Sequence, residues 1–171
     1  MIVWHVAGDS GLGKTVLLEA LITQLPGTTR VLKHSHHLLE GDAQGSDTDR
    51  LSQAATTVRL HQDGIVLRGR HPKLSDFVTW YASQCDHLLI EGLKFLNTPK
   101  IYLSQTAIAP HIRVGTVIGP TPPSSLDTLW IASALPLTTE TAHDIACTLA
   151  SKPTGAGFSW DILQDALGSL D

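Results

Sequence analysis

Apolar and polar positions alternate along the chain in patterns that predict strands and helices in turn. Residues 2–7 form an apolar run, and residues 14–25 place apolar side chains on one helix face until Pro26 and Gly27 end the pattern. A short apolar run at residues 87–90 is typical of a buried parallel strand. The same reasoning predicts further strands at residues 29–35, 99–104 and 113–118, helices at 47–55, 72–84 and 139–150, and a hairpin of residues 56–61 and 64–67.

This alternation favours an α/β architecture with a mainly parallel sheet, to which the hairpin adds an antiparallel element. We expect residues 1–152 to form one nucleotide-binding domain and residues 153–171 a C-terminal tail with a docking helix. Residues 130–135 fit either a strand or a short helix, and Thr139 is the expected cap of the last domain helix.

The segment between the first strand and the first helix reads GDSGLGKT, at residues 8–15. It fits the phosphate-binding pattern G-x-x-x-x-G-K-[ST], and a strand before it and a helix after it are the context that the pattern requires. Glycines let backbone N–H groups approach a phosphate beside the positive end of the helix. Lys14 can reach the β- and γ-phosphates, and the Thr15 hydroxyl is the expected Mg²⁺ ligand. The predicted nucleotide site comprises Gly8, Ser10, Gly11, Gly13, Lys14 and Thr15.

A carboxylate at the end of a second strand is the next candidate. The segment at residues 86–92 reads DHLLIEG, which puts Glu91 at the carboxyl end of the predicted strand and Asp86 at the other end. Ligands of open α/β sheets gather at the carboxyl ends of the strands. We therefore expect Glu91 in the metal shell and treat Asp86 as a loop residue. Lys94 either neutralises phosphate or is solvated.

Residues 33–37 read KHSHH, so His34 and His36 share one face of a strand. They either hold a transition metal with a third ligand or line the nucleotide pocket or a subunit contact. Arg68 and Arg70 either clamp a transferred phosphate or belong to a solvated turn.

Composition narrows the function classes. The 171 residues are 42% hydrophobic and 16% charged, with a net charge of −4, which argues against a general nucleic-acid binder. We see no run near the roughly 20 apolar residues of a membrane span and no signal peptide. Cys85 and Cys147 are expected to be reduced core thiols of a cytoplasmic protein. Sparse charge and exposed sheet edges favour a homodimer.

Four stretches together resemble the MobB family of small P-loop proteins, the molybdopterin-guanine dinucleotide biosynthesis adaptors. They are the loop at residues 8–15, KHSHH at 33–37, GSDTDR at 45–50, and LIEGLK at 89–94 followed by PKI at 99–101. The resemblance covers about residues 2–118. It implies a P-loop NTPase-like three-layer fold.

The resemblance also implies a GTP- and Mg²⁺-binding adaptor that assists the guanylyltransferase attaching GMP to molybdenum cofactor, with molybdopterin a further candidate ligand. At most it would be a slow GTPase, and it would be a homodimer. Carried over by position, Gly8, Gly13, Lys14 and Thr15 would hold phosphate and Mg²⁺, and Lys14 and Glu91 would act in any hydrolysis, with Glu91 near the metal. By the same comparison, His34, His36, Asp47 and Arg50 would surround the open end of the site.

The chain departs from the family pattern in three places. Val16 stands where the family often has a second threonine, and Ser46 where it often has lysine. No N/T-K-x-D element for reading guanine is present, and residues 117–121 occupy the place of a base-reading loop. Two other functions stay open: a P-loop small-molecule kinase that uses ATP, and a metallochaperone GTPase built on the histidine cluster.

Overall fold

The computed structural model describes residues 1–33, 57–61, 64–68, 74–109, 111–124, 128–152 and 156–169. The chain divides into two compact units, one made of Met1–His34 and Ala82–Leu170, the other of Ser35–Tyr81 and Asp171. The predicted helix at residues 47–55 lies outside the described residues.

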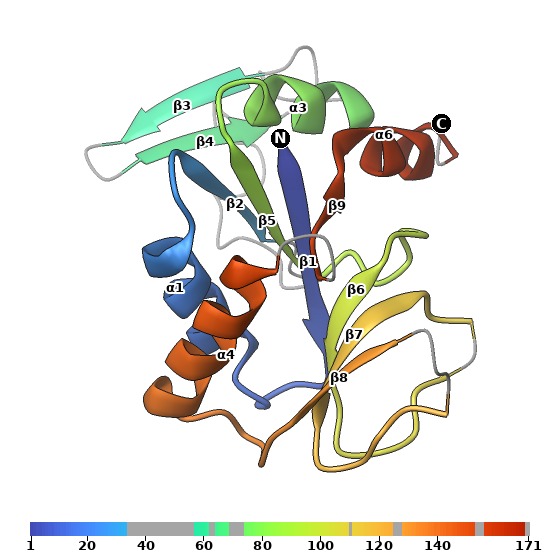
Figure 1. Cartoon of the computed structure of the whole chain (residues 1–171). Helices are drawn as coiled ribbons and strands as arrows, with labels where there is room; N and C mark the ends of the chain where they lie inside the picture. The colour runs from blue at the N-terminus through green and yellow to red at the C-terminus, as the bar shows by residue number, and fades with distance from the viewer. Residues whose placement is uncertain are drawn as a thin grey trace, which may run out of the picture. The chain divides into compact units, whose positions relative to one another are not determined.

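The first unit is built on a sheet whose strands follow the order β2-β5-β1-β6-β7-β8 (Figure 1). Each neighbouring pair along this path is parallel. A further short strand, β9, pairs antiparallel with β1. The strands are β1 (Ile2–Gly8), β2 (Thr29–Lys33), β5 (His87–Glu91), β6 (Lys100–Leu103), β7 (Val114–Gly119), β8 (Leu129–Ala132) and β9 (Phe158–Ser159). The helices are α1 (Lys14–Gln24), α4 (Thr139–Ser151) and α6 (Trp160–Gly168).

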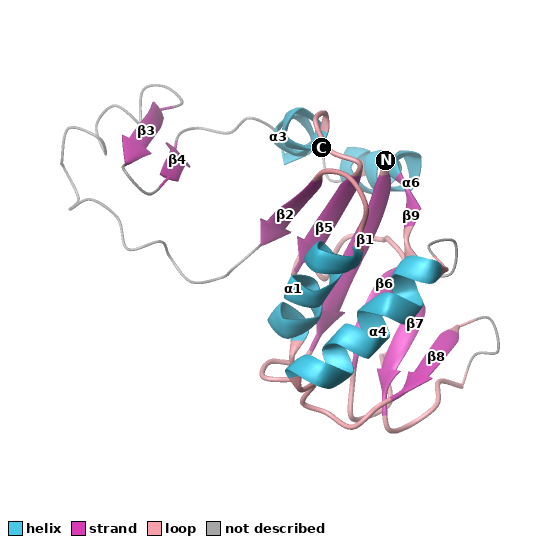
Figure 2. Ribbon diagram, turned by 60° about the vertical axis from the view of Figure 1, so that its left-hand side comes forward, coloured by secondary structure: helices cyan, strands magenta, loops and turns pink. Residues whose placement is uncertain are grey.

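Helices α1 and α4 pack side by side on one face of this sheet (Figure 2). Trp4 and Val6 of β1 point into the core beneath them, together with Leu17 and Leu21 of α1 and Ile145 of α4. Because successive strand residues face opposite sides, His5 lies on the other face of the sheet. Helix α6 contacts β1 and β9, and its buried side chains are Leu163, Ala166 and Leu167. The predicted α/β fold is therefore confirmed, and of residues 130–135 the first three belong to the parallel strand β8, which ends at Ala132.

The second unit contains the predicted antiparallel hairpin. β3 (Thr57–His61) pairs with β4 (Gly64–Arg68) over their full lengths. The helix α3 (Leu74–Ala82) lies within the predicted range of residues 72–84 and ends two residues before it does. On α3 the ring of Phe77 stacks on Tyr81 at a centroid distance of 5.9 Å, the contact that side chains one helical turn apart can make.

Two expectations about α4 are wrong. Thr138, not Thr139, is the N-cap, because Thr138 and Thr141 form a reciprocal capping box. Cys147 is exposed and not a core thiol, because it falls outside the buried stripe of this helix. Cys85 is half-buried, and both cysteines are free. Among the described helices, none has the length and apolar character needed to cross a membrane.

A buried histidine ties the centre of the sheet to the segment that follows β5. His5 is fully buried on β1, with Nδ1 at 2.6 Å from the Thr98 hydroxyl and Nε2 at 2.6 Å from the Gly92 carbonyl. A carbonyl only accepts, so Nε2 carries the proton and Nδ1 accepts from Thr98. Burial, with a smaller contribution from the charge of Lys100, lowers the pKa of His5 to about 4. The ring is therefore neutral at physiological pH.

This low pKa predicts a specific acid sensitivity. In the unfolded chain His5 titrates near its ordinary pKa of about 6.5, so the unfolded state binds more protons between pH 6.5 and 4. Stability that is present above pH 6.5 is then lost as the pH falls, by about 2–3 kcal/mol at pH 4.5. Denaturant unfolding at pH 7 and 4.5 should show a larger acid loss in the wild type than in His5→Phe or His5→Gln. Equal losses would contradict the assignment.

Candidate functional site

The loop predicted to bind phosphate connects β1 to α1 and takes a conformation that its glycines permit. Gly8, Gly11 and Gly13 have φ angles of 137°, 76° and 93°. A Cβ on Gly13 would lie 2.8 Å from the Leu137 Cβ, so this glycine also lets a neighbouring segment pack closely. A Cβ on Gly11 would meet no atom within 4 Å. Gly11 therefore keeps its conformation while facing open space, where a ligand has access.

The amino end of α1 is prepared for an anion. Its N-cap is Gly13, without a side-chain cap, and its first turn contains no acidic residue. The first backbone bond of the helix runs from the Leu17 N–H to the Gly13 carbonyl at 3.0 Å. The N–H groups before Leu17 thus point toward the loop at the positive end of the helix dipole. This is the arrangement that binds phosphate at helix termini.

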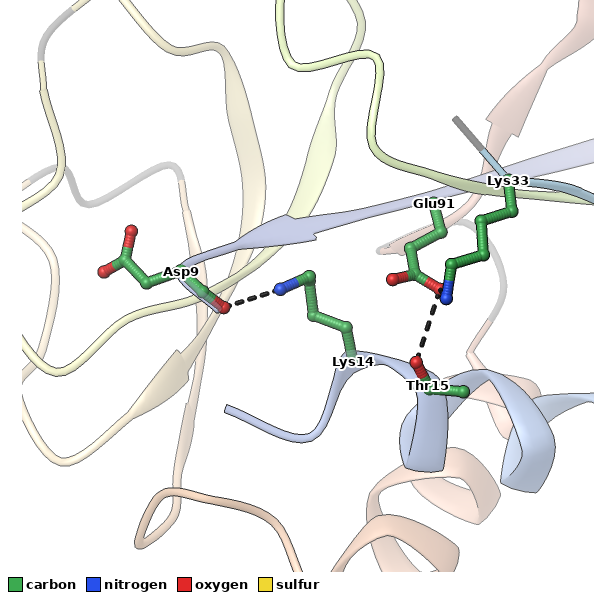
Figure 3. Close-up of polar contacts among 5 residues, drawn as sticks. All are labelled: Asp9, Lys14, Thr15, Lys33 and Glu91. Carbon is green, nitrogen blue, oxygen red and sulfur yellow. Dashed lines mark hydrogen bonds and ion pairs between the residues drawn. The ribbon is translucent and has the colours of Figure 1, made fainter. Parts of the chain in front are cut away.

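Lys14 folds back over the loop (Figure 3). Its ammonium donates to the backbone carbonyl of Asp9 at 2.5 Å, while the Asp9 side chain points away. Burial lowers the pKa of Lys14, and the charges of Lys94 and Lys33 lower it further, whereas Glu91 and Asp9 raise it. A bound polyanion would favour the charged ammonium, because an opposite charge nearby raises the pKa of a lysine.

Glu91 ends β5 beside this loop. The Thr15 hydroxyl donates a long hydrogen bond of 3.5 Å to Glu91 Oε2, and the Lys33 ammonium lies 3.2 Å from the same oxygen (Figure 3). Lys33 and Glu91 are direct partners in the β2–β5 register, which explains their ion pair. The structure thus brings Thr15 and Glu91 together. Asp86 lies at the opposite end of β5, where it accepts a bond from the Thr28 N–H at 2.8 Å.

The charge balance of this cluster suits an anionic ligand. The charges of Lys33 and Lys94 both act on the ammonium of Lys14, and the carboxylate of Glu91 is paired with Lys33. In the described part of the chain, no group of three or more histidine, cysteine, aspartate and glutamate side chains is placed to hold a metal. Thr15 and Glu91 are oxygen donors, and Mg²⁺ is commonly held by one or two such ligands plus phosphate oxygens and water. The donor set therefore fits a magnesium–polyphosphate complex.

The segment before α4 borders the loop, and the sequence did not point to it. The Leu137 N–H, just before α4, donates to the Leu12 carbonyl at 3.1 Å. The Gln105 side chain, just after β6, donates to the Leu135 carbonyl at 3.1 Å. Residues 117–121, which occupy the place of a base-reading loop, include the end of β7 at Gly119. There the Gly119 carbonyl accepts from Trp130 Nε1 and from the Ser133 N–H. Hydrophobic periodicity carries no signal for such long-range contacts.

Six predicted site residues lie outside the described part of the first unit. Arg68 ends β4 in the second unit. His34, His36, Asp47, Arg50 and Arg70 lie outside the described residues. Their proposed roles stay predictions.

Comparison with known proteins decides the family. The family model "Molybdopterin guanine dinucleotide synthesis protein B" (MobB) matches residues 3–116, a range that holds the glycine loop, Glu91 and the segment after it. The chain belongs to the MobB family. Residues beyond 116, which include β8, α4 and α6, lie outside this match.

Individual relatives agree with the MobB assignment. The chain is 36% identical over 107 residues to the "Molybdopterin-guanine dinucleotide biosynthesis adapter protein" of Haemophilus influenzae, and 32% identical over 111 residues to the Escherichia coli protein of the same name. Each match covers 57% of this chain. The chain spans 60% and 62% of the lengths of these two relatives.

Solved MobB structures share the fold. A crystal structure of "molybdopterin-guanine biosynthesis protein B (mobB)" aligns with a TM-score of 0.57 at 17% identity, over 87% of this chain and 98% of that one. A MobB homologue from Bacillus stearothermophilus aligns with a TM-score of 0.55 at 19% identity, over 88% and 96% of the two chains. This structural likeness extends past residue 116, where the family match ends.

Proposed function

We propose that this MobB-family chain binds GTP with Mg²⁺ at the glycine loop and acts in the cytoplasm as an adaptor for molybdopterin guanine dinucleotide synthesis. In this role it assists the guanylyltransferase that attaches GMP to molybdopterin. The family match and the names of the relatives support the pathway. The observation that carries nucleotide binding is the cluster of Lys14, Thr15 and Glu91 at a loop with three left-handed glycines.

Each residue of this cluster has a defined task. The uncapped first turn of α1 and the Lys14 ammonium would hold the phosphates, and Lys14 is already held over the loop by the Asp9 carbonyl. Thr15 and Glu91 would hold Mg²⁺, which when bound neutralises phosphate charge. Glu91 is engaged by Lys33 and Thr15, which suits a metal shell better than a proton-abstracting base. Slow hydrolysis at most is consistent with that engagement.

An exposed sheet edge supports the expected homodimer. β8 ends the strand order of the main sheet, and its Leu129 and Trp130 are 41% and 40% exposed. Unpaired backbone groups on an edge strand are a template for pairing with another chain. We therefore retain self-association as part of the proposal.

Calorimetry with GTP and ATP tests the nucleotide proposal. With Mg²⁺ present, GTP should bind more tightly than ATP, and Lys14→Ala should weaken binding about 10- to 150-fold, the loss expected for a charge-assisted hydrogen bond. Lys152→Ala removes the same charge at the far end of α4 and serves as the matched control. Thr15→Val should abolish most of the Mg²⁺-dependent gain. A higher affinity for ATP than for GTP would favour the kinase function. Wild-type nucleotide affinity in Lys14→Ala would contradict the proposed site.

Complex formation tests the adaptor role. Size-exclusion chromatography at micromolar concentration should show co-elution with the guanylyltransferase of the same pathway. Repeating the co-elution with Lys14→Ala, in the presence and absence of Mg²⁺–GTP, shows whether binding of the partner depends on binding of the nucleotide. Absence of a complex under both conditions would contradict the adaptor role, whatever the outcome of calorimetry.

A further inference from the structure

The segment between β5 and β6 has to cross β1. These two strands flank β1 in the sheet, so residues 92–99 pass over it without a helix. The crossing starts with two left-handed residues, Gly92 at φ 93° and Leu93 at φ 44°. Leu93 is the non-glycine residue of the pair, and a branched side chain takes this conformation only where its surroundings hold it there. The crossing segment is therefore constrained from its first residues.

His5 holds both ends of this segment. From the centre of β1, its Nε2–H donates to the carbonyl of Gly92, and its Nδ1 accepts from the hydroxyl of Thr98. His5 and Thr98 are fully buried. Apolar residues occupy the neighbouring positions of β1. An apolar side chain at position 5 would avoid the free-energy cost of burying a polar ring. An imidazole with both nitrogens engaged instead fixes the position of the segment relative to β1.

Lys100 holds the middle of the segment. Its side chain is almost fully buried, and its ammonium donates to the carbonyls of Leu96 at 2.5 Å and of Thr98 at 3.1 Å. The backbone reinforces the same turn, with Leu96 N–H donating to the Leu93 carbonyl at 3.0 Å. Thr98 is thus bonded twice: its hydroxyl donates to His5, and its carbonyl accepts from Lys100.

Two charged groups at the start of this segment, one just before it and one within it, interact with the glycine loop. Glu91 directly precedes Gly92 and contacts Thr15, and Lys94 follows Leu93 and acts electrostatically on Lys14. We propose that His5, with Thr98 and Lys100, acts as a positioning residue that clamps residues 92–99 so that Glu91 and Lys94 stand at fixed places beside the phosphate loop. This inference rests on the proposed nucleotide function, because it deepens the description of the same site.

Two pairs of variants separate positioning from stability. Thr98→Val removes the partner of His5 at nearly constant volume, and Thr116→Val makes the same change at an equally buried threonine on β7. His5→Phe removes both ring bonds, and His5→Gln keeps an amide N–H that can donate to the Gly92 carbonyl. Thermal unfolding of all four variants shows how much stability each has lost.

The affinity for Mg²⁺–GTP is the first readout. His5→Phe and Thr98→Val should weaken it about 10-fold, the effect seen when groups that orient metal ligands are removed. In both variants the affinity for GTP without Mg²⁺ should fall less than the affinity for Mg²⁺–GTP. Thr116→Val should have the wild-type affinity, and the loss of affinity in His5→Gln should be smaller than in His5→Phe. Wild-type affinity in both His5→Phe and Thr98→Val, or an equal loss in Thr116→Val, would overturn the proposal.

Hydrogen exchange and NMR keep the clamp testable on their own. In Thr98→Val the amides of residues 92–98 should exchange faster than in the wild type, and in Thr116→Val they should not. The ¹⁵N spectrum should show the proton of His5 on Nε2. If the wild type binds no nucleotide, the proposed function is wrong. Hydrogen exchange and the ¹⁵N spectrum then still test whether His5 fixes the position of residues 92–99. Unchanged exchange in Thr98→Val, or a proton on Nδ1, would overturn the clamp.

Discussion

The central place of β1 in the sheet is the constraint on which the rest of the structure depends. β5 and β6 both pair with β1 in parallel, so the carboxyl ends of all three strands meet at one edge. The glycine loop leaves β1 at this edge, and Glu91 ends β5 there. The same arrangement takes residues 92–99 across β1, and His5 of β1 bonds to Gly92 and Thr98 of this segment. The candidate site and its clamp thus follow from one topological requirement.

The charged groups at the carboxyl ends of β1 and β5 determine which ligand this end of the sheet can bind. Burial of Lys14 among other ammonium groups disfavours its charge, and Glu91 offsets this only in part. A polyphosphate with Mg²⁺ would supply the missing negative charge while using Thr15 and Glu91 as oxygen donors. The site therefore carries an electrostatic imbalance that an anionic ligand relieves. Perturbed pKa values cluster at functional sites.

Short stretches of sequence predicted those parts of the site that are formed by residues close together in the chain. The glycine loop, the helix after it and the placement of Glu91 rather than Asp86 at the carboxyl end of β5 all follow from short stretches of sequence. Contacts between distant segments were not predictable, because periodicity does not encode them. They include the pairing of β9 with β1, the packing of Leu137 against Gly13, and the bonds of His5 and Lys100. The cap of α4 was misplaced by one residue, because two adjacent threonines offer the same hydroxyl and only the bond to Thr141 distinguishes them.

The loop from Gly8 to Thr15, together with the end of β5, is the proposed nucleotide-binding site. Hydrogen-exchange mass spectrometry of the intact chain, with and without Mg²⁺–GTP, tests this location directly. At a GTP concentration near the wild-type Kd, we predict protection in peptides that contain residues 8–16 and 91–94, and much weaker protection in Lys14→Ala. Protection confined to other peptides, or identical protection in Lys14→Ala, would contradict the account.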